Sequence, residues 1–156
     1  MKITNATRGD LAAIAELMAE SPLLRRYGVN APRARASVAE GLRERDTVLV
    51  AVERGVVVGL VWLIMTRALD QTAYLRLLLV REGHRSSGIG AALLARAERS
   101  ARAARCRHLA LLVTKTNRRA RAFYARHGYG HVGDLQGFVR PRIDEAIYVK
   151  SWRPRA

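Results

Sequence analysis

The stretch that decides the fold reads Val80-Arg81-Glu82-Gly83-His84-Arg85-Ser86-Ser87-Gly88-Ile89-Gly90-Ala91, where an apolar strand ends and a helix begins. Gly88 and Gly90 lack the Cβ atoms that would block a close approach of the backbone, so successive N–H groups of the turn can point at phosphate oxygens. The helix dipole adds partial positive charge at the same place, and Arg85 supplies a full charge. The stretch therefore predicts a binding site for a pyrophosphate at a helix N-terminus.

Other nucleophile and phosphate motifs do not fit these residues. A Walker-type loop needs Lys-Ser/Thr after the second glycine of Gly83-x-x-x-x-Gly88, and Ile89-Gly90 stands there, which argues against an ATPase or a nucleotide kinase. A dinucleotide fingerprint needs glycine or alanine three residues past Gly90, where Leu93 stands. Ser86-Ser87 lacks the Gly-x-Ser-x-Gly elbow of a hydrolase, so we interpret both serines as part of the loop.

Outward from this stretch, strand and helix patterns alternate without a low-complexity linker or an internal repeat. Residues 72–80 are apolar at nearly every position, as in a central strand covered on both faces. Arg54-Gly55 separates two β-rich runs and suits a tight hairpin. Strands are predicted at 3–6, 47–53, 56–65, 72–80, 108–114, 129–132 and 143–152, and helices from 11 to Pro22, after Pro32, at about 88–104 and at 117–127. The prediction is an α/β fold (α+β by some schemes), a mixed sheet with helices on both faces.

The helical spacing of apolar residues identifies the predicted core. Asp10 is expected to cap the first helix. The residues on the apolar sides of the helices are Leu11, Ile14, Leu17, Met18, Val38, Leu42, Leu93, Leu94, Ala97 and Ala101.

The composition predicts one soluble domain spanning residues 1–156. The longest apolar runs are too short to cross a bilayer, and the N-terminal residues show no signal-peptide pattern, so we expect a cytoplasmic protein without membrane contact. The single Cys106 cannot form an internal disulfide, which agrees with a reducing compartment. His127 and His131 are separated by glycine and lack a cysteine or carboxylate cluster, so no metal site is predicted.

The formal net charge of +15 could reflect attraction to nucleic acid, an anionic membrane or acidic ligands. The 28 basic residues include only three lysines, and the chain is rich in alanine, a pairing that GC-rich coding produces without a functional demand. No aromatic-interleaved basic stripe and no motif for binding DNA or RNA accompanies the arginines. We therefore do not expect nucleic acid as a partner.

Two motifs give the chain a resemblance to a known family. Arg85-Ser86-Ser87-Gly88-Ile89-Gly90, five residues after Val80, matches the pattern Arg/Gln-x-x-Gly-x-Gly/Ala. Residues 117–129 match Asn-x-x-Ala-x-x-Phe-Tyr-x-x-x-Gly-Phe/Tyr. With the order of elements, both motifs make the chain similar to the GCN5-related N-acetyltransferases (GNAT) over almost its whole length. The resemblance implies a mostly antiparallel sheet of about six to seven strands whose central strands splay at an acetyl-CoA site.

The resemblance also implies roles for individual residues. Backbone groups near Leu78 and Val80 would hold the pantetheine arm and the thioester carbonyl, and one N–H would act as an oxyanion donor. Asn117 would hydrogen-bond the cofactor arm. Tyr124 would protonate the departing thiolate, because a phenol carries a proton at neutral pH, although without the motif it reads as a core aromatic beside Phe123. The residues expected to bind acetyl-CoA are Leu78, Leu79, Val80, Arg85, Ser86, Ser87, Gly88, Ile89, Gly90, Ala91, Asn117 and Tyr124, of which Tyr124 is also catalytic.

One departure from the family pattern concerns the general base. Many relatives carry a glutamate on the central strand, and here Arg76, which cannot accept a proton at neutral pH, occupies that region. Deprotonation of the amine is left to a water chain reaching Asp70, Asp144 or Glu145, or to a substrate that binds partly neutral. The sequence names no base.

The acceptor is expected to be a primary amine held by residues 20–32 and 134–142. Arg25, Arg26, Tyr27, Arg140 and Arg142 make these segments basic, which favours an acceptor bearing a carboxylate or phosphate. A peptide or protein amine is the main alternative acceptor, and a homodimer is left open. A hypothesis of another class is a non-catalytic acyl-CoA sensor or a nucleic-acid-associated module.

Overall fold

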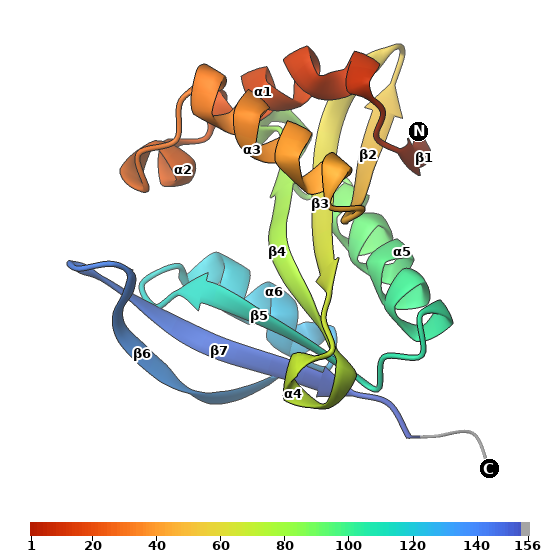
Figure 1. Cartoon of the computed structure of the whole chain (residues 1–156). Helices are drawn as coiled ribbons and strands as arrows, with labels where there is room; N and C mark the ends of the chain where they lie inside the picture. The colour runs from red at the N-terminus through yellow and green to blue at the C-terminus, as the bar shows by residue number, and fades with distance from the viewer. Residues whose placement is uncertain (154–156) are drawn as a thin grey trace. The chain divides into compact units, whose positions relative to one another are not determined.

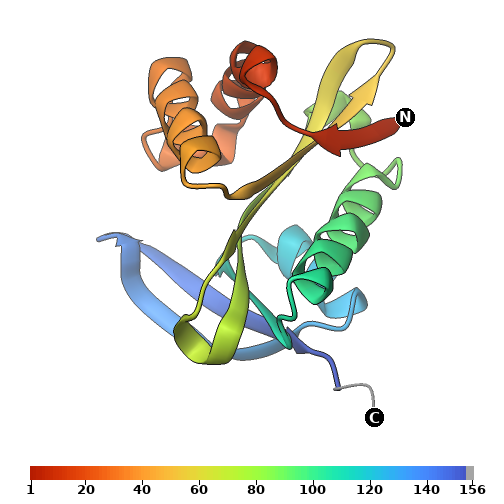
Figure 2. The ribbon, with the colours of Figure 1, turned by 45° about the vertical axis from the view of Figure 1, so that its right-hand side comes forward.

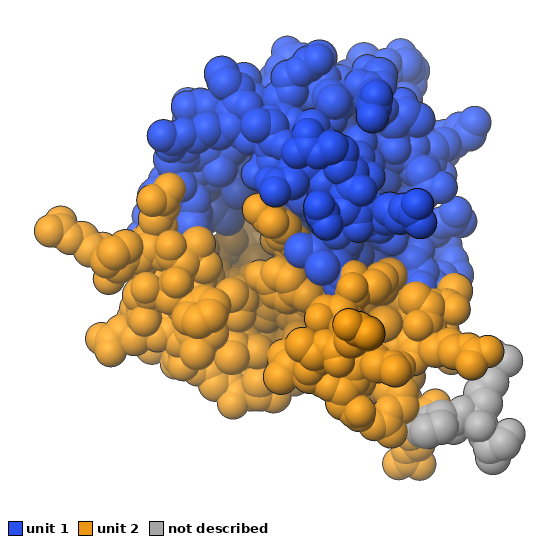
Figure 3. All heavy atoms as spheres, viewed as in Figure 1, with its two compact units in different colours: residues 1–64, 77–100 blue, residues 65–76, 101–156 orange. Residues whose placement is uncertain are grey.

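The computed structural model describes residues 1–153, which divide into two compact units coloured blue and orange in Figure 3. Unit 1 comprises Met1–Ile64 and Leu77–Ser100. Unit 2 comprises Met65–Arg76 and the described chain from Ala101 on. None of the helices in residues 1–153 has the length and apolar character needed to span a membrane.

The elements alternate along the chain as Figure 1 shows, with a seven-stranded sheet in the order β1-β2-β3-β4-β5-β7-β6. β4 pairs with β5 in parallel, whereas β1–β2, β2–β3, β5–β7 and β6–β7 are antiparallel, so the predicted mixed and mostly antiparallel sheet is confirmed. The elements are β1 (Lys2–Asn5), η1 (Arg8–Asp10), α1 (Leu11–Glu20), α2 (Pro22–Arg26), α3 (Ala31–Arg43), β2 (Thr47–Glu53), β3 (Val56–Met65), α4 (Ala68–Gln71), β4 (Thr72–Val80), η2 (Glu82–His84), α5 (Ile89–Ala103), β5 (His108–Thr114), α6 (Arg118–Arg126), β6 (Gly130–Arg140) and β7 (Ile143–Ser151).

Helices cover both faces of the strands of unit 1. In Figure 2, α1 and α3 lie on one side of β2 and β3, and α5 lies on the other. One hydrophobic cluster joins α1 and α3 to alternate residues of the strands, such as Val48, Val50, Leu60 and Trp62. The predicted apolar residues of α1 are buried, and so are Val38 and the predicted side of α5: Leu11, Ile14, Leu17, Met18, Leu93, Leu94, Ala97 and Ala101.

The turns of unit 1 confirm one prediction and correct another. Arg54 and Gly55 both have positive φ (49° and 79°), which gives the tight β2–β3 hairpin that the sequence predicts. Asp10 does not cap α1 with its side chain: its Oδ2 accepts from Thr7 N at 2.7 Å and so closes the preceding 3₁₀ turn. Pro22 follows the end of α1 as expected, but it also begins α2, which the sequence did not predict, with Ser21 Oγ accepting from Leu24 N at 3.3 Å.

Unit 2 contains β5, β6, β7 and the first part of β4, with α6 packed on one face of these strands. The parallel pairing of β4 with β5 covers Thr72 to Leu75. Arg121 of α6 donates from Nε to the Tyr148 hydroxyl at 3.0 Å, so Tyr148 points to the face that α6 covers. Tyr148 pairs with Leu111 of β5, and the buried residues Leu109 and Leu111 therefore lie on the same face. Odd-numbered residues of β5 are buried against α6, whereas His108, Ala110 and Leu112 are half-buried on the opposite face.

Two parts of unit 2 differ from the prediction. The strand predicted at 129–132 extends over Gly130–Arg140 and pairs with β7 up to Arg140↔Ile143. Much of the segment 134–142, which we expected to contact the acceptor, is therefore strand. Its side chains are mostly exposed, and pairing with β7 rather than burial stabilises it. The short α4 was not predicted, and it contains Leu69, Asp70 and Gln71 in the left-handed region, with φ of 49°, 58° and 59°.

The positive charge is distributed unevenly between the units. Unit 1 carries thirteen basic and nine acidic residues. The described part of unit 2 carries fourteen basic residues and only four acidic ones. The excess of arginine over carboxylate is therefore concentrated in unit 2.

Replacing Gly41 with alanine is expected to destabilise unit 1. A Cβ at Gly41 in α3 would lie 2.4 Å from Cζ2 of Trp62, a buried side chain fixed by a 2.8 Å hydrogen bond from Nε1 to Asp46. The overpacking cost of roughly 1–3 kcal/mol should exceed the gain of about 1 kcal/mol in helix propensity. Urea unfolding checks this, with Gly9→Ala as the control because its Cβ would meet only Thr7 Oγ1 at 3.5 Å. An unfolding midpoint for Gly41→Ala at or above that of the parent would contradict it.

Candidate functional site

The loop between β4 and α5 lies wholly in unit 1 and is fixed at both ends by backbone hydrogen bonds. At its start, Arg81 N donates to Val58 O of β3 at 2.8 Å. His84 N then donates to Arg81 O at 2.9 Å within the short turn η2. At its end, Ala92 N donates to Gly88 O at 3.0 Å, which closes the first turn of α5. Arg85 to Ala91 are thus brought together in one continuous turn, as the sequence predicts.

The loop conformation leaves backbone donors available to an anion. Ser86 and Gly88 have positive φ, 64° and 84°, so the backbone adopts the left-handed conformation twice before α5 begins. A Cβ on Gly88 would have no protein atom within 4 Å, which leaves open space beside the helix N-terminus. The first N–H groups of a helix, here those of Ile89 to Ala91, have no acceptor within the helix. Together with the helix dipole they form a site suited to phosphate oxygens.

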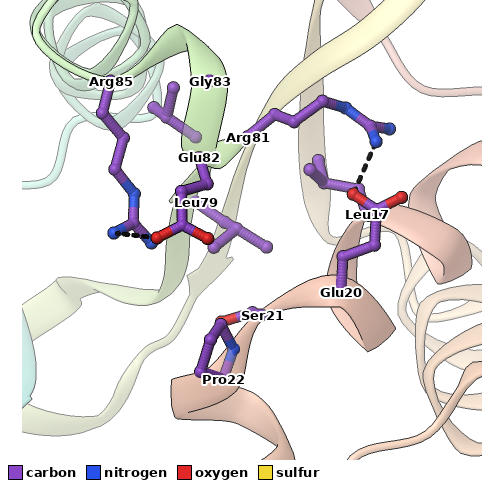
Figure 4. Close-up of a pocket in the computed structure, with 10 residues that line it drawn as sticks. Leu17, Glu20, Ser21, Pro22, Leu79, Arg81, Glu82, Gly83 and Arg85 are labelled. Atoms are coloured by element: carbon purple, nitrogen blue, oxygen red, sulfur yellow. Dashed lines mark hydrogen bonds and ion pairs between the residues drawn. The ribbon is translucent and has the colours of Figure 1, made fainter.

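A cavity of about 250 Å³ adjoins this loop within unit 1. Figure 4 shows Arg85 directed toward Glu82 and Arg81 directed toward Glu20, with Leu79 between the two pairs. Arg85 Nη1 lies 3.8 Å from Glu82 Oε1, a loose contact that a phosphate could replace. The lining residues are Leu17, Glu20, Ser21, Pro22, Leu79, Val80, Arg81, Glu82, Gly83 and Arg85.

Arg81 connects three parts of unit 1 at the edge of this cavity. Its Nη1 lies 2.5 Å from Glu20 Oε2 at the end of α1, and its Nε and Nη2 donate to Val57 O at 3.4 and 3.3 Å. Its side chain is 23% exposed, so the ion pair is partly shielded from water. Sequence reasoning missed the pairing of Arg81 with Glu20, because no motif joins two residues that lie 61 positions apart.

The last residues of β4 also line the site. Leu79 and Val80 contribute to the cavity wall, and Leu78 is half-buried beside them. The expectation that 72–80 is covered on both faces along its whole length was wrong, since Arg76 is exposed and Leu77 to Val80 are only half-buried. The proposed hydrogen bonding of their backbone groups to a cofactor stays a prediction.

Asn117 and Tyr124 belong to unit 2. Asn117 is the N-cap of α6, where its Oδ1 accepts from Ala120 N at 3.1 Å, so only its amide NH₂ is left to donate to a ligand. Tyr124 is 7% exposed and packs edge-on against Phe123 and Tyr129, with ring centroids 5.2 and 5.6 Å away.

The Tyr124 hydroxyl is buried and protonated at neutral pH. Burial raises the pKa of Tyr124 well above its ordinary value, so the phenol stays protonated throughout the neutral and mildly alkaline range. Among residues 1–153, no partner forms a hydrogen bond with this hydroxyl. Tyr124 therefore packs as a core aromatic beside Phe123, the alternative that the sequence offered, but this packing does not hold its hydroxyl oxygen.

The other predicted candidates have different surroundings. Asp70 is exposed and forms an ion pair with Arg107 at 2.5 Å, and Asp144 Oδ1 accepts from Gly137 N at 2.9 Å, whereas Glu145 is 3% exposed. Of the basic acceptor segments, Arg25 donates to Glu20 O at 3.1 Å. Within residues 1–153 no group of three or more histidine, cysteine or acidic side chains is arranged to hold a metal ion.

Comparison with known proteins gives one family and one fold. The model of the "Acetyltransferase (GNAT) family" matches residues 12–129. A search of curated proteins found no match.

Solved structures of similar fold cover the chain almost completely. An aminoglycoside 6'-N-acetyltransferase complexed with coenzyme A has a TM-score of 0.84 at 17% identity, covering 100% of this chain and 99% of that chain. The ribosomal-protein-alanine N-acetyltransferase of Brucella melitensis has a TM-score of 0.79 at 22% identity over 97% and 100%. The PaiA N-acetyltransferase of Thermoplasma acidophilum in complex with coenzyme A has a TM-score of 0.78 at 18% identity over 97% and 98%. At these identities the likeness concerns the fold.

Replacing Gly88 with alanine is expected to weaken coenzyme A binding more than it weakens folding. The positive φ costs an alanine about 1–2 kcal/mol, and the new methyl group would occupy the open space beside the helix N-terminus. Thermal unfolding with and without coenzyme A measures both effects. Gly55→Ala in the β2–β3 hairpin is the matched control, since its φ is also positive, 79°, and its Cβ also meets no atom within 4 Å. Equal stabilisation by coenzyme A in both variants would place the ligand elsewhere.

Proposed function

Because the chain belongs to the GNAT acetyltransferase family, we propose that it transfers the acetyl group of acetyl-CoA to a primary amine, by direct attack of the amine in a ternary complex. The observation that carries the proposal is the anion site at the N-terminus of α5 with its adjoining cavity. A pyrophosphate carries the negative charge that such a site favours. Coenzyme A has a pyrophosphate joined to an extended pantetheine arm, and this arm would reach the end of β4.

The proposal assigns the cofactor to three sets of residues. The pyrophosphate binds the N–H groups from Arg85 through Ser86, Ser87, Gly88, Ile89 and Gly90 to Ala91, with the Arg85 guanidinium exchanging Glu82 for a phosphate oxygen. The pantetheine arm follows the backbone of Leu78, Leu79 and Val80. Asn117 contributes its amide NH₂, because its side-chain oxygen is engaged in capping α6.

The chemical step needs an oxyanion donor and a proton for sulfur. A backbone N–H near Leu78 stabilises the negative charge that develops on the thioester oxygen when the amine attacks. As the C–N bond forms and the C–S bond breaks, Tyr124 gives its proton to the departing thiolate. The proton that nitrogen releases on forming the amide then restores the phenol. Burial supports this role, since it keeps Tyr124 protonated before the reaction.

The proposed acceptor is an amine that bears a carboxylate or phosphate, and a peptide or protein amine is the alternative. Arg26, Arg140 and Arg142 are exposed in the two segments that we expect to contact it. The proposed location is the cytoplasm, where the free Cys106 would stay reduced.

Thermal unfolding with and without acetyl-CoA, followed by thiol release across a panel of amines and peptides, tests the function. A ligand that binds only the folded state raises its apparent stability, by about 2.7 kcal/mol at a hundredfold excess over Kd. Stabilisation with amine-dependent thiol release is the expected outcome. Stabilisation without release from any amine would favour a non-catalytic sensor, and no stabilisation at saturating acetyl-CoA would exclude the proposal.

Replacing Tyr124 with phenylalanine is expected to lower kcat by roughly 10²- to 10⁴-fold, the usual contribution of a general acid. Acetyl-CoA should stabilise the variant as it stabilises the parent, because only the hydroxyl is removed. Tyr129→Phe is the matched control, since Tyr129 is equally buried and packs on Tyr124. A Tyr124→Phe enzyme with the kcat of the parent would assign the phenol to the core alone.

A further inference from the structure

Two segments of unit 1 that are far apart in the sequence form walls of the cavity beside the β4–α5 loop. One is the end of α1 with the first residues of α2, and the other is the end of β4 with the start of the loop. The ion pair between Glu20 and Arg81 joins these two segments (Figure 4). Neither residue belongs to the motifs at 85–90 and 117–129.

The Arg81 guanidinium is held by strand β3 as well as by Glu20. Its Nε and Nη2 donate to Val57 O at 3.4 and 3.3 Å, and the backbone N of Arg81 donates to Val58 O at 2.8 Å. Because a guanidinium is planar, these contacts also fix the direction of Nη1, which lies 2.5 Å from Glu20 Oε2. The strand therefore presents a fixed cation to the end of α1.

Glu20 connects this cation to the start of α2. Ser21 follows it directly, and Ser21 Oγ accepts from Leu24 N at 3.3 Å as the N-cap of α2. Arg25 Nη2 donates to the Glu20 carbonyl oxygen at 3.1 Å, which ties α2 back to the same residue. Ser21 and Pro22 line the cavity, so a shift of Glu20 would move part of the cavity wall.

The other arginine–carboxylate pair at this cavity is built differently. Arg85 and Glu82 both belong to the loop, and Arg85 Nη1 lies 3.8 Å from Glu82 Oε1. A ligand can replace Glu82 there without moving α1. The Arg81 side chain is 23% exposed and uses three nitrogens in contacts within the protein. Arg81 is therefore better suited to link two segments than to bind a phosphate.

We propose that Arg81 is a positioning residue for acetyl-CoA: its ion pair with Glu20 holds the start of α2 beside the β4–α5 loop and so sets the shape of the cavity next to the proposed pyrophosphate site. The inference rests on the proposed acetyl transfer and adds a residue that acts on the cofactor only through others. Loss of the ion pair lets the wall that bears Ser21 and Pro22 move, which weakens cofactor binding. The chemical step is unaffected, because neither charged side chain takes part in it.

Glu20→Gln tests the proposal with little risk to folding, because Glu20 is exposed and glutamine has nearly the same size. At a fixed acceptor concentration, the KM for acetyl-CoA should rise roughly 3- to 10-fold with kcat unchanged, an effect between that of an exposed ion pair and that of a hydrogen bond to a charged group. The Kd obtained from thermal unfolding with acetyl-CoA should rise by the same factor. Glu16→Gln is the matched control, since it removes the same charge from an exposed residue one turn earlier in α1 and should leave both constants unchanged.

Arg81→Gln, made in the parent and in Glu20→Gln, separates positioning from direct contact. In the parent it should raise the KM for acetyl-CoA, whereas in Glu20→Gln it should add little, because both changes break the same link. An equal rise in both backgrounds would make Arg81 a ligand of the cofactor and overturn the inference. A KM for Glu20→Gln at or below that of the parent would also overturn it, and this comparison decides alone if Arg81→Gln folds poorly. Failure of the parent itself to bind acetyl-CoA would instead remove the proposed function, and the inference with it.

Discussion

The close approach of α5 to β3 at Gly59 is the constraint on which the geometry of the β4–α5 loop depends. A Cβ at Gly59 would lie 2.8 Å from Leu93 Cδ1, 3.1 Å from Ile89 Cγ2 and 3.3 Å from the carbonyl oxygen of Leu79. Even the methyl group of an alanine there would force the side chains of Leu93 and Ile89 on α5 to shift. Because Ile89 is the first residue of α5, contact at this glycine sets where the helix N-terminus lies relative to the end of β4.

Hydrogen bonds and an ion pair also fix the β4–α5 loop. Arg81 ties the end of β4 to β3 through Val57 and Val58, and to α1 through Glu20, so the loop starts from a fixed point. Gly88 lets the loop end with its donors open to solvent. The proposed anion site is thus a product of tertiary packing on one side and of local backbone conformation on the other.

The sequence predicted the strands that are long and apolar, and it predicted the loop. β2, β3, β4 and β5 begin and end at the predicted residues, because continuous runs of β-branched and leucine residues bounded by turns leave little ambiguity. β6 was underestimated, since Gly133 and Gly137 interrupt its pattern and its exposed side chains give no signal; pairing with β7 makes it a strand. The pairing of Arg81 with Glu20 was not found, because it joins residues that are distant in the chain.

The uneven charge of the two units has a consequence for kinetics. Unit 2, with fourteen basic and four acidic residues, produces a positive field that acts over a distance of about 10 Å at 0.1 M salt. Coenzyme A is a polyanion, so this field accelerates its encounter with the protein and slows the departure of the spent cofactor. At low cofactor concentration, added salt is therefore expected to lower the turnover rate, because it slows the encounter. At saturating cofactor, added salt is expected to raise the turnover rate wherever product release limits it.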